Sequence, residues 1–413
     1  MAPPAPPCPD APAAPPCIPD ASPTVEAQAT LPDHLTEDIL LRLTKAADLA
    51  RASMAGPSLR RIVADHAFLR RFRTLHPPPL LGILSDPFIP AQPPHPSAAA
   101  ARTLADADFS CSFLPSRDRP WIRRDCRDGR ALFCVAPDGD DRALVRDVAV
   151  CDPLHRRYLL LPPVPQDLSD LVYHCQLFLA PAGGDIAADA PFRFRVMCLA
   201  KYQTQLVIFV FSSSGPRAGQ WHAVAFDGWS ALVAQVSQGE DVRSSTVFGE
   251  RYYAHGCFCW AIPGIGKLLM LDIATMEFSS VNLPPSPWSN SQMAFVEARE
   301  GRIGLFAVSH NRLMYTILGS IGDDDPRLWY MGAVVPLSRD YAYYIIGVAG
   351  GYLLLHGYPD NPESSFELPE PDCISLDLQT MNLEWFCETG WIMPLKSQLL
   401  YAGFPPSLSP PTI

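Results

Sequence analysis

The stretch LLMLDIATMEFSSVNLPP (residues 268–285) has the pattern of a strand, an aspartate, a tight turn and a second strand. Two other stretches share this frame, VAVCDPLHRRYLLLPP (148–163) and CISLDLQTMNLEWFCET (373–389). The aspartates that occupy the shared position are Asp152, Asp272 and Asp377. An aspartate at the start of a turn accepts hydrogen bonds from the backbone N–H groups that come after it. Each copy therefore predicts a β-hairpin.

The spacing of these hairpins favours a β-propeller. AVAFDGWSALV (223–233), around Asp227, is a looser fourth copy, and GRIGLFAVSHNRLMYTILG (301–319) fits as one further unit without the aspartate. Together the copies fit a period of about 50 residues, the length of a four-stranded propeller blade. Alternating strands and short apolar runs continue from residue 105 to residue 405, which is enough for roughly six blades. A pair of β-sandwiches is the alternative fold that the same strands allow.

Composition excludes several classes of function. The formal net charge of −11 argues against nonspecific binding to nucleic acid or to an anionic membrane. No run of apolar residues is long enough to span a bilayer, and the Ala/Pro-rich N-terminus lacks the features of a signal peptide. The 12 cysteines include no Cys-x-x-Cys pair and are expected to be reduced. We therefore expect a soluble protein of the cytoplasm or nucleus.

Changes in composition along the chain predict five segments. They are a disordered Ala/Pro-rich leader (1–28), a small all-α unit (29–75), a Pro/Ala-rich connector whose apolar residues pack against the next domain (76–104), the propeller-like domain (105–405) and a tail (406–413). Proline fixes φ and removes a backbone donor, and the leader has no residues from which to build a core. The small unit carries eight Arg/Lys and five Asp/Glu, so its local charge is opposite in sign to that of the whole chain.

The small unit begins with LPDHLTEDILLRLTKAADLARAS (31–53) and has the pattern of three short helices. Apolar residues recur at spacings of three and four in the first helix, at Leu35, Ile39, Leu40 and Leu43. Pro32 suits the first turn of that helix, Thr44 suits an N-cap of the second, and Pro57 starts the third. Phe68, Leu69 and Phe72 add a further turn or two. A unit of this size cannot bury its own apolar surface, so we expect another protein surface to cover it.

Residues 31–72 resemble an F-box along their whole length. The resemblance rests on Leu31-Pro32, the acidic residue after them, Leu35, Ile39-Leu40, Leu43, Asp48-Leu49, Ser53 and the Arg-Arg-Ile-Val-x-Asp of residues 60–65. F-boxes dock onto a Skp-type adaptor, which holds them to the cullin of an SCF ubiquitin ligase. The resemblance implies that Leu31, Pro32, Leu35, Ile39, Leu40, Leu43 and Leu49 face the adaptor or support the face that does. The alternative for each leucine is a place in the internal core of the unit.

The chain after the F-box is similar to the large plant F-box families that carry a C-terminal β-propeller. A looser likeness to kelch repeats lies in Gly350-Gly351 after an apolar strand, in the Leu-Asp-Leu-x-Thr around Asp377 and in Trp385. The resemblance implies a substrate receptor of an SCF-type E3 ligase, with the propeller binding an unknown target protein and no catalytic residue, metal or cofactor. The chain departs from the F-box pattern at Ala55-Gly56 and Leu59, where the family usually has Val-Cys and Trp. The loss of an aromatic side chain there is expected to weaken adaptor binding.

Motifs that would indicate catalysis or a metal site are incomplete. His255, Cys257 and Cys259 alternate along one strand, but zinc sites prefer wider spacing and a second pair of ligands. Gly264-Ile265-Gly266-Lys267 lacks the spacing of a phosphate-binding loop and leads into a strand, so it predicts a hairpin turn. We therefore expect a binding protein and not an enzyme. The main rival function is a propeller that binds a small ligand or glycan and does not act with a cullin.

Overall fold

The chain folds as two compact units, which the computed structural model divides after Phe72. The structure describes residues 31–43, 46–76, 78–135, 145, 147–165, 174–181, 194–202, 205–234, 248–284, 293–319, 328–359, 372–389 and 399–403. The predicted leader (1–28), the tail (406–413) and the predicted helix cap Thr44 lie outside these residues. No helix of the described part is both long and apolar enough to cross a membrane.

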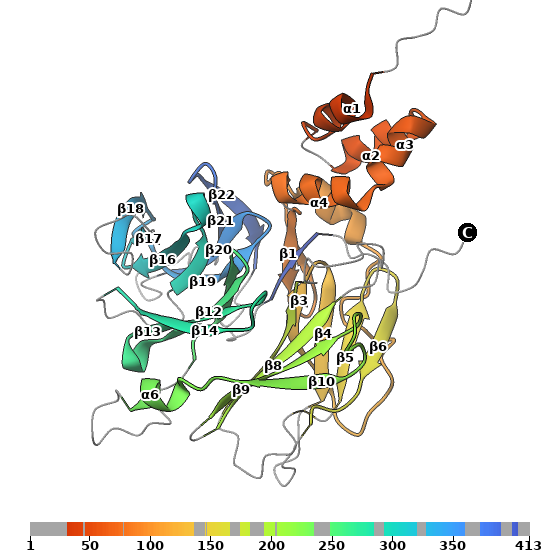
Figure 1. The fold of residues 1–413 in the computed structure, drawn as a ribbon. Coiled ribbons are helices and arrows are strands. Elements are labelled where there is room, and N and C mark those ends of the chain that lie inside the picture. The colour runs from red at the N-terminus through yellow and green to blue at the C-terminus, as the bar shows by residue number, and fades with distance from the viewer. Residues whose placement is uncertain are drawn as a thin grey trace, which may run out of the picture. The chain divides into compact units, whose positions relative to one another are not determined.

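The first unit is helical (Figure 1). Its helices are α1 (Asp33–Leu40), α2 (Ala46–Met54), α3 (Pro57–Ala64) and α4 (His66–Leu75), whose last three residues follow the division after Phe72. Helix α3 begins at Pro57, as predicted, with Gly56 as its N-cap. The expected extra turn at Phe68 is instead a separate helix, because Asp65 is extended at ψ 128° and ends α3. The Asp65 carboxylate accepts a hydrogen bond from the Phe68 N–H at 2.8 Å and so caps α4.

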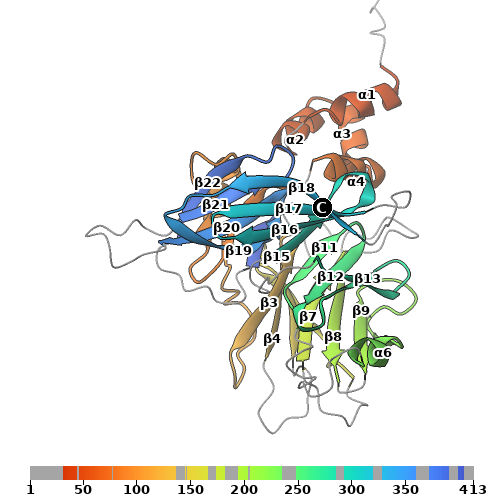
Figure 2. The same ribbon diagram turned by 90° about the vertical axis from the view of Figure 1, so that its left-hand side faces the viewer.

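The second unit is a six-bladed β-propeller within the described residues. Blade 1 contains β3 (Trp121–Arg127), β4 (Arg130–Val135), β5 (Val148–Asp152) and β6 (Arg157–Leu161), and blade 2 contains β7 (His174–Ala180), β8 (Arg195–Lys201), β9 (Leu206–Ser212) and β10 (Trp221–Ala225). Blade 3 contains β11 (Arg251–Ala254), β12 (Cys257–Ile262), β13 (Lys267–Asp272) and β14 (Phe278–Asn282), and blade 4 contains β15 (Met293–Glu297), β16 (Ile303–Ser309), β17 (Arg312–Leu318) and β18 (Trp329–Pro336). Blade 5 contains β19 (Tyr341–Ala349), β20 (Tyr352–Pro359), β21 (Asp372–Asp377) and β22 (Leu383–Glu388), and blade 6 contains β23 (Leu399–Ala402), β1 (Leu80–Leu84) and β2 (Ile89–Pro90). Pairing within each blade is antiparallel, and Figure 2 shows the strands of blades 4 and 5 from the side. The short helices of this unit are α5 (Ala98–Ala101), α6 (Trp229–Val233) and the 3-10 turns Arg102–Leu104, Pro263–Ile265 and Arg299–Gly301.

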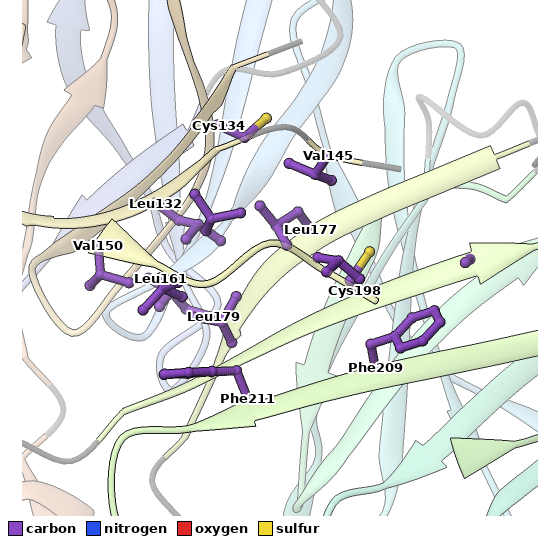
Figure 3. Packing of buried hydrophobic residues seen from close by; sticks show 14 of the residues in the cluster. Leu132, Cys134, Val145, Val150, Leu161, Leu177, Leu179, Cys198, Phe209 and Phe211 are labelled. Atoms are coloured by element: carbon purple, nitrogen blue, oxygen red, sulfur yellow. The ribbon is translucent and has the colours of Figure 1, made fainter. Parts of the chain in front are cut away.

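Apolar clusters join each blade to the next around the ring. Residues that share a cluster include Leu132 and Phe209 in blades 1 and 2, Phe178 and Trp260 in blades 2 and 3, Cys259 and Phe295 in blades 3 and 4, Phe306 and Tyr343 in blades 4 and 5, Leu354 and Leu80 in blades 5 and 6, and Tyr401 and Cys126 in blades 6 and 1. Figure 3 shows the first of these clusters, in which Leu132 and Val150 of blade 1 pack toward Leu177 and Phe211 of blade 2. The hydrophobic core is therefore divided among the blade interfaces.

Blade 6 closes the ring with strands from both ends of the propeller unit. Strand β1 pairs with β23 in the register Leu80↔Ala402 to Leu84↔Leu399, and Figure 1 shows the two side by side. The segment expected to be a connector (76–104) thus supplies two strands of the propeller, which begins at Leu80 and not at residue 105. Every residue of β1 is buried, so its sequence has no alternation that would mark it as a strand. Gly82 is required there, because an added Cβ would clash with the carbonyl oxygen of Ile89.

The three predicted hairpins are confirmed as the turns between the third and fourth strands of blades 1, 3 and 5. In each copy one carboxylate oxygen of the aspartate accepts two backbone hydrogen bonds. The donors are Leu154 and His155 to Asp152, both at 3.1 Å, Ala274 and Thr275 to Asp272 at 2.7 and 3.0 Å, and Gln379 and Thr380 to Asp377 at 2.7 and 2.9 Å. The fourth residue after each aspartate has positive φ: Arg156 (52°), Met276 (60°) and Met381 (61°). The shared frame therefore specifies one turn geometry.

The looser fourth copy around Asp227 is not a hairpin, and that prediction was wrong. Strand β10 ends at Ala225, and the residues after Asp227 form α6. Trp229, at the start of α6, is 1% exposed and stacks on Phe248 at 5.8 Å between ring centroids. Burial of this indole in the core between blades 2 and 3 favours a helical turn over a second strand.

We predict that the aspartates of the confirmed hairpins stabilise the propeller. Asp272→Ala should lower the free energy of unfolding by about 1 kcal/mol, the usual value of two local backbone hydrogen bonds to a half-exposed carboxylate. The hydrogen bonds from Thr275 and Ala274 also lower the pKa of Asp272. This contribution is therefore present at neutral pH and is lost as the pH falls through the lowered pKa of the folded state. Urea unfolding at pH 7 and pH 3 measures it, with the exposed Asp227→Ala as control; equal effects of the two substitutions at pH 7 would contradict the prediction.

A second prediction concerns His95, which is 3% exposed and lies edge-on against Tyr352 and Phe386. Its Nδ1 accepts a hydrogen bond from the Ser97 N–H at 3.1 Å. Burial lowers the pKa of His95 to about 4. Below the ordinary histidine pKa of about 6.5 the unfolded chain binds a proton that the folded chain does not, so stability falls between pH 6.5 and 4, by up to about 3 kcal/mol.

The substitution that tests this prediction is His95→Asn, which keeps an acceptor for Ser97 and does not titrate. We expect the loss of stability between pH 7 and pH 4.5, measured by urea unfolding, to be smaller in the variant than in the wild-type chain. Parallel pH profiles for the two proteins would show that His95 takes up its proton equally well when folded.

Candidate docking surface

The structure separates the seven predicted adaptor-binding residues into an exposed group and a buried group. The exposed group lies along α1 and the residues before it: Leu31 (52% exposed), Pro32, Leu35 (44%) and Ile39 (54%). Leu40 and Leu49 are each 4% exposed, and Leu43 is half-buried. Leu35 and Ile39 are four residues apart in α1 and so lie on one side of the helix. Leu31 precedes the N-cap Pro32 and is exposed as well. We call these three residues the α1 apolar line.

The buried group belongs to the internal core of the helical unit. The members of this core are Leu40, Leu41, Leu49, Ile62, Phe68 and Phe72, with Leu43, Ala52, Leu59, Val63 and Leu69 packed against them. Helical periodicity did not identify Leu41, because it lies one residue beyond the end of α1. Met54, at the end of α2, is the most exposed large apolar residue described, at 69%.

The residues that depart from the F-box pattern leave the third helix intact. Leu59 packs into the internal core, and Ile62 of the same helix is 3% exposed. Gly56 has extended backbone at φ −178°, which other residues adopt equally well, and a Cβ placed there would meet no atom within 4 Å. Ala55 is exposed. These positions therefore change the side chains around the turn into α3 without removing the helix.

Two acidic residues, Asp33 and Glu37, join α1 to the rest of the unit from the side opposite to Leu35 and Ile39. Asp33 forms an ion pair with Arg61 of α3 at 2.6 Å, and Arg71 of α4 lies 3.2 Å from Glu37 and 3.6 Å from Asp38. Residues two apart in a helix are separated by about 200°, so Asp33 and Glu37 face away from Leu35. Exposed ion pairs contribute little stability, about 0–1 kcal/mol each. Their effect is to place the Asp33 and Glu37 charges toward α3 and α4, while Asp38 lies at the flank of the apolar side.

The exposed apolar line can bind a complementary protein surface. A fully buried leucine or isoleucine side chain contributes about 1.5–3 kcal/mol, and these three are already about half covered. Their burial against a partner would therefore contribute roughly 3 kcal/mol in total. The unit itself is held by the internal core, so covering the line requires no rearrangement of that core.

The propeller residues that we considered for metal binding do not converge. The His255 ring nitrogen Nε2 lies 2.9 Å from the carbonyl oxygen of Ala298, while Cys259 is fully buried in the core between blades 3 and 4. Burial raises the pKa of the Cys257 and Cys259 thiols, which opposes the thiolate that a metal needs. No group of three or more His, Cys, Asp or Glu residues in the described part of the chain could hold a metal ion.

The Gly264–Lys267 segment is a hairpin turn, as predicted. It connects β12 to β13 through a single 3-10 turn, with Gly266 at φ 60°. The Lys267 ammonium donates to the side-chain oxygen of Asn282 at 2.8 Å. The Lys267 side chain is thus paired with β14, the outer strand of its own blade.

Comparison with known proteins gives matches among solved structures alone: no family model and no curated protein matches the chain. The chain is similar to apo AztD from Citrobacter koseri, with 14% identity, coverage of 69% of this chain and 60% of that chain, and a TM-score of 0.30. It is also similar to the β-propeller domain of the Trilobed protease from Pyrococcus furiosus (8% identity, 65% and 72% coverage, TM-score 0.31) and to Hsv2 from Kluyvelomyces marxianus (8%, 65% and 85%, TM-score 0.29). The chain thus spans about 60% of the length of AztD. The propeller fold itself is established by the six sheets and the six clusters between them.

Proposed function

We propose that the chain is a substrate-recognition subunit of an SCF-type E3 ubiquitin ligase. The helical unit docks on a Skp-type adaptor through the α1 apolar line, and the adaptor joins it to a cullin. The propeller binds the target protein and performs no chemistry. The observation that carries the proposal is that Leu35 and Ile39 are about half exposed on one side of α1, opposite the Asp33 and Glu37 carboxylates that pair with α3 and α4, and that Leu31 before the helix is exposed as well.

The physical contribution of such a subunit is to hold two other proteins close together. Holding a target and a ubiquitin-charged enzyme on one scaffold converts their encounter into an effectively intramolecular event. The receptor then needs two binding surfaces and no catalytic residue. The resemblance of residues 31–72 to an F-box supports the first surface, and the propeller provides the second. A Skp-type adaptor and a cullin would place the complex in the cytoplasm or nucleus.

Co-elution of the full chain with a recombinant Skp-type adaptor and cullin tests the proposal. We expect one complex that contains all three proteins and that loses the chain when the adaptor is left out. A complex with the adaptor that excludes the cullin would favour the rival function, a propeller that binds a small ligand or glycan without a cullin. Absence of the chain from every complex, with circular dichroism confirming that it is folded, would contradict the proposal.

A further inference from the structure

Two thiols of blade 2 lie in contact beside an arginine. No disulfide joins the described cysteines, and the Sγ atoms of Cys175 on β7 and Cys198 on β8 are 3.3 Å apart. Cys175 pairs with Ala200 and Cys198 pairs with Leu177, so both side chains project from the same face of the two neighbouring strands. A disulfide bond is about 2.05 Å long, so the sulfurs need to approach by roughly 1.3 Å, together with a small shift of the two strands because the residues are diagonal neighbours.

A third thiol and a positive charge complete the surroundings of this pair. Arg124 of β3 donates from Nε to the Cys134 sulfur at 2.9 Å. Cys134 belongs to the same core cluster as Cys198, between blades 1 and 2, and Figure 3 shows both sulfurs among Val145 and Leu177. The Arg124 side chain is exposed, and Cys175 is only partly buried. Cys175 is therefore the least buried thiol of this group.

We propose that Cys175 and Cys198 are a reversible oxidation site for hydrogen peroxide or a related hydroperoxide. The Cys175 thiolate attacks one peroxide oxygen; an S–O bond forms, the O–O bond breaks and hydroxide leaves, so sulfur is oxidised to a sulfenic acid and the peroxide is reduced. The Cys198 sulfur then attacks the Cys175 sulfur. The S–S bond forms, the S–O bond breaks, and the departing oxygen leaves as water with the proton of Cys198.

The environments of the two thiols assign these roles. A hydrogen bond from Cys198 lowers the pKa of Cys175, and the charge of Arg124 acts in the same direction against the effect of burial. The same hydrogen bond, together with burial, raises the pKa of Cys198. Because the thiolate is the nucleophile, Cys175 reacts first and Cys198 resolves the sulfenic acid.

A second thiol pair in the same chain provides a matched control. Cys111 and Cys151 are hydrogen-bonded to each other, but they are 2% and 0% exposed. That hydrogen bond and burial raise the pKa of Cys151, and the groups that shift it include no arginine. We expect this sealed pair to stay reduced under conditions that oxidise Cys175 and Cys198.

The test is oxidation of the reduced full chain by a small molar excess of hydrogen peroxide, with subsequent digestion without reductant and mass spectrometry. Tryptic cleavage after Arg195 separates the two cysteines, so a disulfide appears as two linked peptides, each containing one of them. We expect this linked species to form and to disappear on treatment with dithiothreitol, with Cys111 and Cys151 unmodified.

Variants distinguish the proposed roles of Cys175 and Cys198 from nonspecific oxidation of thiols. Cys198→Ser should leave the Cys175 sulfenic acid unresolved and open to trapping by dimedone, whereas Cys175→Ser should give no dimedone adduct at Cys198. Arg124→Gln should slow the oxidation of Cys175 about threefold, because it removes a charge that stabilises the thiolate. Equal oxidation of the sealed pair, or dimedone labelling of Cys198 with Cys175 present, would overturn the proposal, as would the absence of any Cys175–Cys198 link. Oxidation of the chain alone involves no adaptor, so its outcome is independent of the proposed function.

Discussion

Replacing Asp125 by alanine is expected to lower the free energy of unfolding of the propeller by about 3–5 kcal/mol, the usual cost of removing one partner of a buried ion pair. Asp125 lies on β3 and is 4% exposed. One of its carboxylate oxygens is 2.7 Å from the guanidinium of Arg251 on β11, and the other accepts the Leu179 N–H of β7 at 2.7 Å. A single carboxylate thus joins blades 1, 2 and 3.

The cost arises from the groups that the substitution would leave behind. The Arg251 side chain is 15% exposed and lies over the Phe178 ring at 4.4 Å. Burial lowers the pKa of Arg251, and Asp125 opposes that effect. Without the carboxylate, a buried guanidinium and a buried backbone N–H both lose their acceptor, and each unsatisfied group costs folding free energy.

Urea unfolding of Asp125→Ala, with the exposed Asp106→Ala as control, measures this effect. The double variant Asp125→Ala with Arg251→Met should recover part of the lost stability, because it removes the buried charge as well as its partner. A loss below about 0.5 kcal/mol for Asp125→Ala, the range of ordinary surface substitutions, would show that the ion pair does not hold the three blades together.

Replacing Leu35 and Ile39 together by aspartate is expected to weaken binding to a Skp-type adaptor about a thousandfold. The double substitution removes roughly 2 kcal/mol of apolar burial and places two unpaired carboxylates in an apolar interface at a cost of a few kcal/mol more. Because a factor of ten in affinity corresponds to about 1.4 kcal/mol, the sum reaches about three orders of magnitude. Both side chains are exposed in the free chain, so the helical unit should remain folded.

A matched control adds the same charge elsewhere on the unit. Ser58→Asp with Ala67→Asp places two carboxylates at exposed positions in the first turns of α3 and α4, where the helix dipole tolerates them. Isothermal titration calorimetry of the full chain with adaptor should give near wild-type affinity for this control. Equal affinities for the control and for the Leu35/Ile39 variant would show that the α1 apolar line is not the docking surface.

Local features of the fold could be predicted from the sequence, and long-range ones could not. The hairpins at Asp152, Asp272 and Asp377 are set by hydrogen bonds to residues two and three positions away, so the sequence alone specifies them. The pairing of Leu80 with Ala402 joins residues from opposite ends of the propeller unit, and no local pattern encodes it. Asp125 lies in the charged run WIRRDCRDGR, which looks solvent-exposed in sequence, although the structure buries it against Arg251.

The candidate docking surface could be predicted only as a set of residues. Helical spacing identified Leu35, Ile39, Leu40 and Leu43 as apolar positions of the first helix. It could not decide between the outer side and the core, because an apolar stripe around a short helix serves both purposes. The packing of Leu40 and Leu41 against Leu49, Ile62 and Phe68 makes that choice, and these partners come from the later helices of the unit.

The most direct test of the docking proposal is amide hydrogen exchange of the full chain, measured with and without a Skp-type adaptor. We expect exchange in residues 31–43 to slow when the adaptor is bound, because the α1 apolar line is then covered, while β3, β7 and β11 of the propeller exchange as they do in the free chain. Unchanged exchange in residues 31–43, together with protection of propeller strands, would contradict the account and would identify the propeller as the surface that the adaptor contacts.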